Sequence, residues 1–221
     1  MKKRLVIFGS GPIAQLAHYY FSTDSAYEVV AFTVDAAYLK ETSFCGLPVV
    51  AFEEVTAHYP IDQVNFFVAI SYAKLNAVRK DKYLAGKALG YRVASYISSR
   101  ATILNEGRIG ENCFILEDNT VQPFVTIGNN VTLWSGNHIG HHSTIGDHVF
   151  MASHVVVSGN VDIGEQCFIG VNATLRDHIN IGAKCVIGAG ALLLADALPE
   201  GAYIGNATER SRAPSTRLRG I

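Results

Sequence analysis

Histidines are the side chains of this sequence whose type and spacing most directly suggest catalysis. Five of the eight histidines fall between residues 138 and 154, namely His138, His141, His142, His148 and His154. Histidine is the one side chain whose ordinary pKa allows it to accept a proton near pH 7, so an outward histidine beside a groove can act as a general base. A solvated imidazole without a function is the alternative for each of them taken singly.

A second pattern indicates which of these histidines face outward. An aliphatic residue stands at every sixth position from 97 to 193: Ile97, Ile103, Ile109, Ile115, Val121, Ile127, Leu133, Ile139, Ile145, Met151, Val157, Ile163, Ile169, Leu175, Ile181, Ile187 and Leu193. A period of six residues is typical of a parallel β-helix, whose coils bury one side chain per repeat. His141 and His142 hold the third and fourth positions of the hexad that begins at Ile139, where side chains point outward. We therefore predict that these two histidines are the catalytic residues, with His141 as the base.

The β-helix should complete one coil in three hexads, or eighteen residues. One of its three faces has an Ile-Gly pair in every coil, and we expect the glycine there because the corner needs a backbone conformation that a Cβ would hinder. We expect chemistry on the two variable faces. Cys113, Cys167 and Cys185 each follow a repeat aliphatic by four residues and are predicted to be core residues, and Cys45 stands alone without a C-x-x-C partner. The five Ile-Gly pairs begin at Ile109, Ile127, Ile145, Ile163 and Ile181.

The first ninety or so residues alternate between strand and helix patterns, which predicts a small parallel α/β sheet. We expect strands at 3–9, 28–35, 47–52, 64–71 and 91–96, and helices at 12–21, 53–58 and 73–89. The turn Gly9-Ser10-Gly11 lacks the third glycine of a dinucleotide fingerprint, so we do not expect bound NAD. A glycine turn into a helix still offers N–H groups for phosphate, and Asp35 is placed to reach a ribose or base hydroxyl. A tight turn without a ligand is the alternative.

Composition narrows the function class further. The chain has 221 residues and a formal net charge of −1, which gives no broad attraction to nucleic acid or to an anionic membrane. Its apolar N-terminal run stops at Gly9, too short for a signal peptide or a membrane span, so we expect a cytoplasmic protein. The predicted organisation is an α/β domain at 1–95, a β-helix at 96–200 and a tail at 201–221. The tail is basic through Arg210, Arg212, Arg217 and Arg219, and a solvated terminus is the simplest interpretation of it.

The combination of these two domains resembles the left-handed β-helix (hexapeptide-repeat) acyltransferases. It is most similar to the branch of bacterial nucleotide-sugar acetyltransferases that N-acetylate 4-amino-4,6-dideoxy sugars, and to the related sialic acid O-acetyltransferases. The resemblance implies a Rossmann-like nucleotide-sugar-binding domain followed by a left-handed parallel β-helix. The motifs that support it lie at 9–11, 137–147 (Asn-His-Ile-Gly-His-His-Ser-Thr-Ile-Gly-Asp), 158–161, 169–174, 187–191 and 203–206.

The resemblance also implies an activity, namely transfer of acetyl from acetyl-CoA to an amino or hydroxyl group of a nucleotide-linked sugar. Such a step serves surface polysaccharide or glycan synthesis. His141 aligns with the family's catalytic base, and Gly9, Ser10, Gly11 and Asp35 would bind the substrate. The family's coenzyme channel lies between adjacent subunits, which implies a homotrimer without a metal. The coenzyme residues implied by position are Phe150, Gly159, Val171 and Ala189.

The chain departs from the family pattern at three places. His142 replaces the carboxylate that often follows the catalytic histidine, so Asp147 or a carboxylate of a neighbouring subunit is needed to orient His141. Phe150 replaces a histidine that contacts acetyl-CoA in some relatives. Pro12-Ile13-Ala14 replaces Gly-Gly-His near the nucleotide turn.

Three alternatives to amine acetylation stay open on the sequence. The nucleophile could be a sugar hydroxyl, as in the sialic acid enzymes. The β-helix could serve only to trimerise a nucleotide-sugar-binding domain in a non-catalytic scaffold. Trimeric β-helices also include zinc carbonic anhydrases, but those need a histidine about two coils before the cluster, near 102–118, and none occurs there.

Overall fold

The computed structural model describes residues 2–210 and 215–217, and Arg212 and Arg219 of the predicted basic tail lie outside this range. Its first part is a six-stranded sheet of order β3-β4-β2-β1-β5-β6, which is parallel except for β3, an antiparallel partner of β4. The strands are β1 (Lys3–Phe8), β2 (Tyr27–Val34), β3 (Ser43–Phe44), β4 (Leu47–Ala51), β5 (Asn65–Val68) and β6 (Arg92–Val93). The helices are α1 (Pro12–Thr23), α2 (Val55–His58) and α3 (Ala77–Ala88), with the 3₁₀ turns η1 (Ala36–Tyr38) and η2 (Phe52–Glu54).

Strand β1 lies at the centre of this sheet, between β2 and β5. Residues 5–8 are buried on both faces, as expected for a central parallel strand. Proline at the first position of α1 starts that helix directly after the glycine turn, and no side chain caps its N-terminus. The chain order reverses between β1 and β5, and ligands of such sheets bind outside the carboxyl ends of the strands at that point.

Two elements differ from the sequence prediction. Helix α3 begins at Ala77 rather than at 73, because Lys74, Leu75 and Asn76 have φ of 50°, 51° and 66°. The predicted strand at 91–96 is two strands, β6 in the α/β sheet and β7 (Tyr96–Ile97) in the β-helix. The first difference lies where residues 75 and 76 contact the β-helix, and the second where the chain passes from the α/β sheet into the β-helix.

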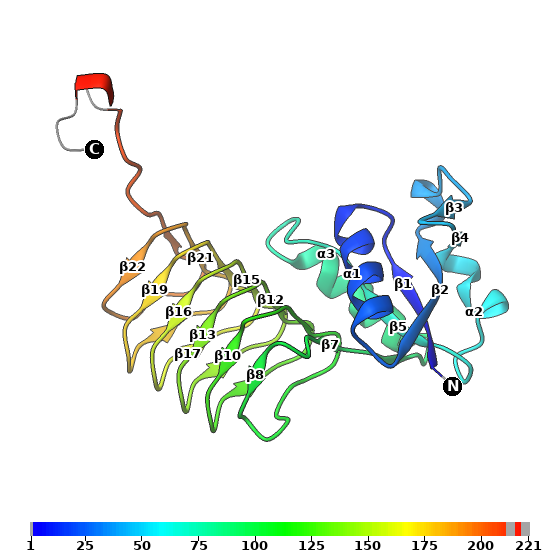
Figure 1. Cartoon of the computed structure of the whole chain (residues 1–221), viewed down its shortest axis with the longest axis horizontal. Coiled ribbons are helices and arrows are strands. Elements are labelled where there is room, and N and C mark those ends of the chain that lie inside the picture. The colour runs from blue at the N-terminus through cyan, green and yellow to red at the C-terminus, as the bar shows by residue number, and fades with distance from the viewer. Residues whose placement is uncertain (1, 211–214, 218–221) are drawn as a thin grey trace.

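The second part is a parallel β-helix of stacked triangular coils (Figure 1). Its strands are two residues long, and successive coils pair at a spacing of eighteen residues, as in Thr120↔His138. The last coil is shorter, and there Val186 pairs with Ala202. One face contacts the α/β part, and we call it the docked face. It contains β7, β9 (Phe114–Ile115), β12 (Thr132–Leu133), β15 (Phe150–Met151), β18 (Phe168–Ile169), β21 (Val186–Ile187) and β23 (Ala202–Tyr203). The third face contains β8 (Thr102–Ile103), β10 (Thr120–Val121), β13 (His138–Ile139), β16 (Val156–Val157), β19 (Thr174–Leu175) and β22 (Leu192–Leu193). The Ile-Gly face contains β11 (Thr126–Ile127), β14 (Thr144–Ile145), β17 (Asp162–Ile163) and β20 (Asn180–Ile181).

The aliphatic ladder forms the core of the β-helix. Every ladder position from Ile115 to Leu193 is buried, and burial of each side chain contributes about 1.5–3 kcal/mol. Cys113, Cys167 and Cys185 are buried in the same core, as predicted. The first coil is the exception: Ile97 is 38% exposed, and Ile103 and Ile109 are half-buried, because no earlier coil covers them.

The glycines of the Ile-Gly face serve a different purpose from the one expected. None of them has a positive φ, so the corner does not require a left-handed glycine there. A Cβ on Gly128 would instead lie 2.8 Å from the backbone nitrogen of Asp147, and one on Gly164 would lie 2.6 Å from that of Ala183. These glycines therefore allow close stacking of successive coils. The left-handed conformation occurs two residues later in the hexad, at Asn112, Asn130 and His148 among others.

Helix α3 joins the two parts through a buried guanidinium. Arg79 is 1% exposed, and its Nη2 donates to the backbone oxygens of His148 and Val149 at 2.9 and 3.3 Å and to Oδ1 of Asn76 at 3.2 Å. Its Nη1 donates to the hydroxyl of Thr132. The guanidinium also lies 5.6 Å from the ring centre of Phe150. The docked face thus contacts the α/β part through a cation that has no carboxylate partner among the described residues.

A column of polar side chains at one edge of the docked face completes this contact. Asn112 donates to Asn130 at 2.8 Å, and Asn130 Nδ2 lies 2.9 Å from Nδ1 of His148. Asn112 also accepts from the backbone N–H of Val68, the last residue of β5, at 2.8 Å. Gln166 donates to the backbone oxygen of Leu75 at 3.0 Å. His148 is therefore a structural residue of the domain contact.

We expect His148 to make the stability of the protein depend on pH. Burial, and then the charge of Lys80, lowers the pKa of His148, so the folded state favours the neutral ring. The free energy of unfolding should be largest above the unfolded-state pKa of about 6.5 and should decrease as pH falls below it. Chemical denaturation of the wild type and of His148→Asn between pH 5 and 8 measures this.

Asparagine is the matched replacement for His148, because it accepts left-handed φ and continues the Asn112–Asn130 column. His148→Asn should lose stability less steeply between pH 6.5 and 5 than the wild type. Some dependence should remain, because burial also lowers the pKa of His18. Parallel pH curves for the two proteins would contradict the role given to His148.

Candidate functional site

His141 lies at the corner that joins the third face to the Ile-Gly face, between β13 and β14. Its side chain is exposed, as predicted, and its backbone N–H donates to Oε1 of Gln122 in the preceding coil at 2.9 Å. The ring lies against the backbone of the following coil. A Cβ on Gly159 would come within 2.6 Å of the ring carbon Cε1, so this position must be glycine for the ring to occupy its place. The structure therefore brings together the predicted residues His141 and Gly159.

His142 contacts His141 directly. The two Nδ1 atoms are 3.1 Å apart, and the His142 ring packs on Phe124 with ring centres 4.7 Å apart. A hydrogen bond between two imidazole nitrogens requires one to donate and the other to accept. If His141 donates from Nδ1, its Nε2 is left as an exposed acceptor. Asp147 is not positioned to orient His141, because its Oδ1 accepts from the backbone N–H of Asn129 at the next corner, at 2.7 Å.

The other histidines of the cluster lie elsewhere. His148 is buried in the domain contact, and His138 is on the third face. His154 is at the corner between the docked and third faces, where its ring covers Gly136. His142, His148 and His154 share a left-handed φ of 58–64°, which histidine tolerates better than most side chains. The tolerance of histidine for this turn conformation therefore explains part of the clustering of histidines between residues 138 and 154.

The four predicted coenzyme residues do not form one group. Val171 and Ala189 are exposed on successive coils at the corner between the docked and third faces, and Gly190 N–H donates to Val171 O at 2.8 Å. Gly159 is at the other edge of the third face, beside His141. Phe150 is 4% exposed, stacked on Phe168 and covered by Tyr72 and Arg79. We therefore leave Phe150 out of the coenzyme site, because it has no surface to offer a ligand.

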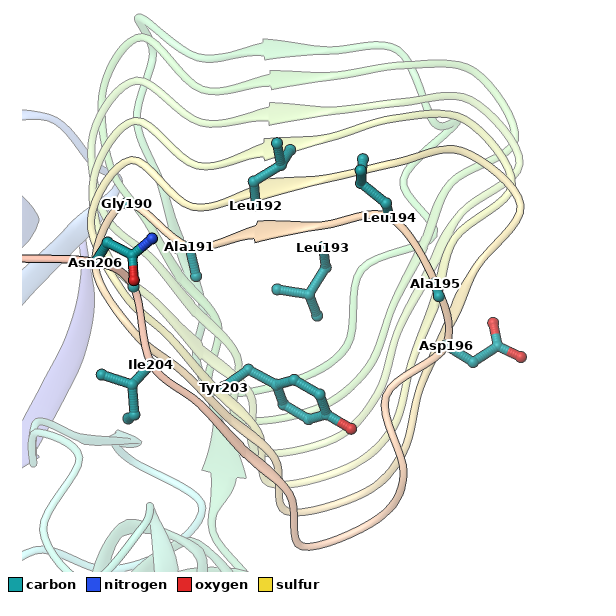
Figure 2. A pocket seen from close by; sticks show the side chains of 11 residues that line it. Gly190, Ala191, Leu192, Leu193, Leu194, Ala195, Asp196, Tyr203, Ile204 and Asn206 are labelled. Carbon is teal, nitrogen blue, oxygen red and sulfur yellow. The ribbon is translucent and has the colours of Figure 1, made fainter.

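A pocket of about 560 Å³ lies at the last coil of the β-helix, next to Ala189. Figure 2 shows Leu193 and Tyr203 pointing into the end of the triangular core, while Leu192 and Leu194 point outward. The Tyr203 hydroxyl accepts from the backbone N–H of Leu198 at 2.8 Å, so this ring closes much of the core. Most of the pocket is thus the end of the coil stack rather than a built catalytic site.

A cavity of about 360 Å³ opens at the carboxyl ends of β1, β2 and β5. It is lined by the predicted substrate residues Gly9, Ser10, Gly11 and Asp35. Gly9 has φ of 125° and lies so close to Ala69 that a Cβ would be 2.8 Å from the Ala69 oxygen. A Cβ on Gly11 would meet nothing within 4 Å, so that residue leaves the entrance open.

Lys82 is a residue of this cavity that the sequence did not reveal. Its Nζ lies 2.5 Å from Oδ1 of Asp35 and 5.4 and 5.8 Å from the ring centres of Phe8 and Phe52. In the sequence, Lys82 is one of several lysines in an amphipathic helix, where a solvated face is the natural interpretation. Only the packing of α3 on the sheet brings its ammonium to the ends of β1 and β2.

The cavity and His141 lie on different sides of one chain. The α/β part contacts the docked face, whereas His141 is at the corner formed by the other two faces of the prism. Among the described residues, no helix is long and apolar enough to cross a membrane. In the same part of the chain, no three His, Cys, Asp or Glu side chains are grouped to hold a metal ion.

Family models match the β-helix directly. The model "Bacterial transferase hexapeptide (six repeats)" matches residues 107–140 and 125–159, and "Hexapeptide repeat of succinyl-transferase" matches residues 160–195. Residues 107–195 are hexapeptide repeats. This hexapeptide region contains His141, Gly159, Val171 and Ala189. A search of curated protein sequences gave no match to the chain.

Solved structures resemble the hexapeptide region and the α/β part together. The acetyltransferase domain of PglB from Neisseria gonorrhoeae FA1090, in complex with acetyl coenzyme A, has a TM-score of 0.82 at 23% identity and covers 93% of this chain and 97% of its own. PerB from Caulobacter crescentus, in complex with CoA and GDP-perosamine, has a TM-score of 0.81 at 22% identity, with 91% and 93% covered. WeeI from Acinetobacter baumannii AYE has a TM-score of 0.77 at 22% identity, with 92% and 97% covered. The predicted fold, a Rossmann-like sheet followed by a left-handed parallel β-helix, is confirmed.

The contact between His141 and His142 predicts opposite tautomers. With both rings neutral, one of the two should hold its proton on Nδ1 and the other on Nε2, because two N–H groups cannot hydrogen-bond to each other. Nitrogen-15 NMR of ring-labelled histidine distinguishes the two forms, and the His141→Asn and His142→Asn variants assign the signals. If both rings carried their protons on Nε2, no such hydrogen bond would exist.

Proposed function

We propose that this protein transfers the acetyl group of acetyl-CoA to an amino group of a nucleotide-linked sugar, in the synthesis of a surface polysaccharide or glycan. The observation that most supports this is the exposed imidazole of His141, whose ring lies directly over the backbone of Gly159 in the hexapeptide region. The similar folds of PglB, described with acetyl coenzyme A, and PerB, described with CoA and GDP-perosamine, point the same way. The cytoplasmic location predicted from the sequence belongs to this proposal.

In the proposed reaction, the sugar amine attacks the carbonyl carbon of the thioester. His141 Nε2 accepts a proton from the attacking nitrogen, while its Nδ1–H donates to Nδ1 of His142. The C–N bond forms as the C–S bond breaks, and the proton passes from His141 to the departing sulfur. The transient oxyanion needs a hydrogen-bond donor, which a backbone N–H of the corner can supply. A neutral His142 replaces the family's carboxylate, so it orients His141 without a charge.

We infer that acetyl-CoA contacts the third face and its two corners. Gly159 would hold the acetyl end beside His141, and Val171 and Ala189 would contact the rest of the coenzyme through the opposite corner. The pocket beside Ala189 gives this corner additional open surface. The small, exposed side chain of Ala189 leaves room for a long flexible ligand at its corner.

The nucleotide-sugar would occupy the cavity of the α/β part. Backbone N–H groups of Ser10 and Gly11, at the start of a twelve-residue helix without a side-chain cap, suit a diphosphate. The Gly9 N–H already donates to the Thr33 oxygen at 2.8 Å, so Gly9 would contribute close approach of the backbone rather than a donor. The ammonium of Lys82, which pairs with Asp35 in the free protein, can pair with the phosphate when the nucleotide binds. Asp35 is then free to accept from a ribose hydroxyl.

We further propose a homotrimer in which the site is shared between subunits. In one chain the nucleotide cavity is on the side of the docked face, and His141 is on the opposite corner. A second copy must therefore bring its His141 to the sugar. Val156, Leu192 and Leu194, which are exposed apolar side chains on or beside the third face, suit a subunit contact.

The experiments below also distinguish two alternative functions from the N-acetyltransferase activity. A sugar hydroxyl in place of the amine would make the protein an O-acetyltransferase with the same base. A scaffold that binds nucleotide-sugars without catalysis would show no binding of acetyl-CoA by calorimetry. The contact between His141 and His142 favours catalysis, because it can leave Nε2 of His141 as an exposed acceptor.

Replacement of His141 tests the proposed chemistry. With acetyl-CoA and saturating 4-amino-sugar nucleotides linked to UDP, dTDP, GDP or CMP, His141→Ala and His141→Asn should lower kcat by about 10²–10⁴-fold, because the general base is lost. The KM for acetyl-CoA should change little. Steady-state kinetics with thiol detection measures both values.

His178→Asn is the matched control, because His178 is an exposed histidine at the same corner of the prism, two coils after His142, whose left-handed φ of 58° it shares. It should retain wild-type kinetics. A near wild-type kcat in both His141 variants would remove His141 as the base and leave substrate positioning as the main source of rate.

A complementation experiment tests the shared site. The His141→Asn variant and an Asp35→Ala/Lys82→Ala double variant should each be inactive when expressed alone. Mixed oligomers of the two should regain about one quarter of wild-type activity, because random assembly pairs an intact cavity with a neighbour's intact histidine in about one site in four. If each site lay within one chain, mixed oligomers would stay inactive.

A further inference from the structure

Phe124 is an aromatic residue at a corner of the β-helix that the core of the β-helix does not use. Its side chain is 51% exposed and is not among the buried residues that fill the coils. Its φ is 66°, in the left-handed region that bulky side chains rarely adopt. Packing of the core therefore does not account for a phenylalanine at this position.

The other hexads show how unusual this residue is. From Glu106 to Gly190 the fourth residue of every hexad has a positive φ, and all of these residues except Phe124 are polar or glycine. Glycine and asparagine tolerate this conformation well, whereas a phenyl ring gains nothing from it. An unfavourable backbone conformation that the fold does not need points to a function.

The ring of Phe124 contacts His142. The two residues occupy the same corner of successive coils, after β10 and β13 (Figure 1). Their ring centres are 4.7 Å apart with 36° between the ring planes, so the phenyl ring packs on one face of the imidazole. A second neighbour of this imidazole is His141, whose Nδ1 lies 3.1 Å from Nδ1 of His142 and whose ring plane is at 86° to it. His142 is thus held between an apolar face and a hydrogen-bond partner.

The coil that contains Phe124 also holds the backbone of the two histidines. Oε1 of Gln122 accepts from the N–H of His141 at 2.9 Å, and the Pro123 oxygen accepts from the N–H of His142 at 3.3 Å. These bonds fix the backbone at the corner, but they leave the imidazole of His142 free to turn about χ2, a torsion with broad minima. Contact with the Phe124 ring restricts that rotation.

We propose that Phe124 is a positioning residue for the imidazole pair, because its ring holds His142 in the orientation in which Nδ1 faces Nδ1 of His141. This role rests on the proposed function, in which His141 accepts the proton of the sugar amine. A base that is already aligned needs no further ordering in the transition state, so the contact increases kcat rather than the affinity for either substrate. The strain at Phe124 is thereby explained, since the residues that suit this backbone offer no ring to cover the imidazole.

Phe124→Asn removes the ring and relieves the backbone at the same time. Because asparagine tolerates a left-handed φ, the Tm of the variant should equal or exceed that of the wild type. Its kcat should nevertheless fall about 10–10²-fold, with little change in the KM of acetyl-CoA or of the nucleotide-sugar. Phe124→Tyr keeps the ring and should retain most of the wild-type kcat. Thermal denaturation and steady-state kinetics measure these values, and a loss of Tm together with kcat would make Phe124 a folding residue instead.

A double-mutant cycle tests whether Phe124 acts through His142. His142→Asn should lower kcat by itself, and addition of Phe124→Asn to that variant should lower kcat no further, because the imidazole that Phe124 positions is already absent. If the two losses multiply, Phe124 acts on the reaction directly and the proposal fails. A raised KM of the nucleotide-sugar for Phe124→Asn would overturn it as well, because the exposed ring would then be a substrate contact.

Glu106→Asn is the matched control. Glu106 is exposed, has a left-handed φ of 57°, and occupies the same corner one coil before Phe124 and two coils before His142. The variant should retain the kcat of the wild type. Size-exclusion chromatography of both variants should show the wild-type oligomer. A smaller species for Phe124→Asn alone would place its ring in a subunit contact and contradict the positioning role.

Nitrogen-15 NMR of ring-labelled histidine separates this inference from the proposed function, because it needs no turnover. The wild type and Glu106→Asn should show opposite tautomers of His141 and His142, and Phe124→Asn should lose them as the His142 ring becomes free to turn. If Phe124→Asn keeps the opposite tautomers, the positioning role fails even where acetyl transfer is detected. If it loses them but the wild type acetylates no nucleotide-sugar, the positioning of the pair stands and the transferase function fails.

Discussion

The placement of the α/β part on the β-helix depends on the buried guanidinium of Arg79. Burial of a charge without an opposite charge costs several kcal/mol, and burial also lowers the pKa of Arg79 below its usual range. Backbone oxygens of His148 and Val149, the Thr132 hydroxyl and the face of Phe150 offset this cost. These partners come from two successive coils, so a shift of α3 along the β-helix would break several contacts at once. The contact therefore specifies one relative position of the two parts.

Helix α3 connects this contact to the cavity at the carboxyl ends of β1, β2 and β5. Asn76, Arg79 and Tyr83 lie on the side of α3 that packs on the β-helix, while Val78 and Lys82 line the cavity. The left-handed residues before α3 delay its start until Asn76 can donate to the backbone oxygen of Cys167 at 3.0 Å. The same helix thus lines the cavity on one side and anchors the α/β part to the β-helix on the other.

Much of the β-helix was predictable because its rules are local. A period of six identified the core residues, the three buried cysteines and the outward histidines, since each coil repeats the same backbone. The start of α3, the burial of His148 and Phe150, and the ion pair of Lys82 with Asp35 were not predictable. The first three depend on how the two parts pack against each other, and the ion pair depends on how α3 packs on its own sheet. No periodic pattern records such packing. The role of the Ile-Gly glycines was misjudged for a similar reason, because the clash that excludes a Cβ comes from the next coil.

Stacking of coils imposes a pairwise rule that bears on catalysis. Residues eighteen apart lie one above the other at a corner, so a ring there packs on the side chain of the adjacent coil, as His142 does on Phe124, or lies over a glycine. His141 over Gly159 and His154 against Gly136 both satisfy this rule. A candidate base in such a repeat is therefore recognised by its own exposure together with the glycine that makes room for its ring. By this criterion, two histidines of the cluster, His141 and His154, lie over a glycine. His141 also has a second imidazole within hydrogen-bond distance of its ring, which fixes the ring and directs Nε2 to the proposed substrate.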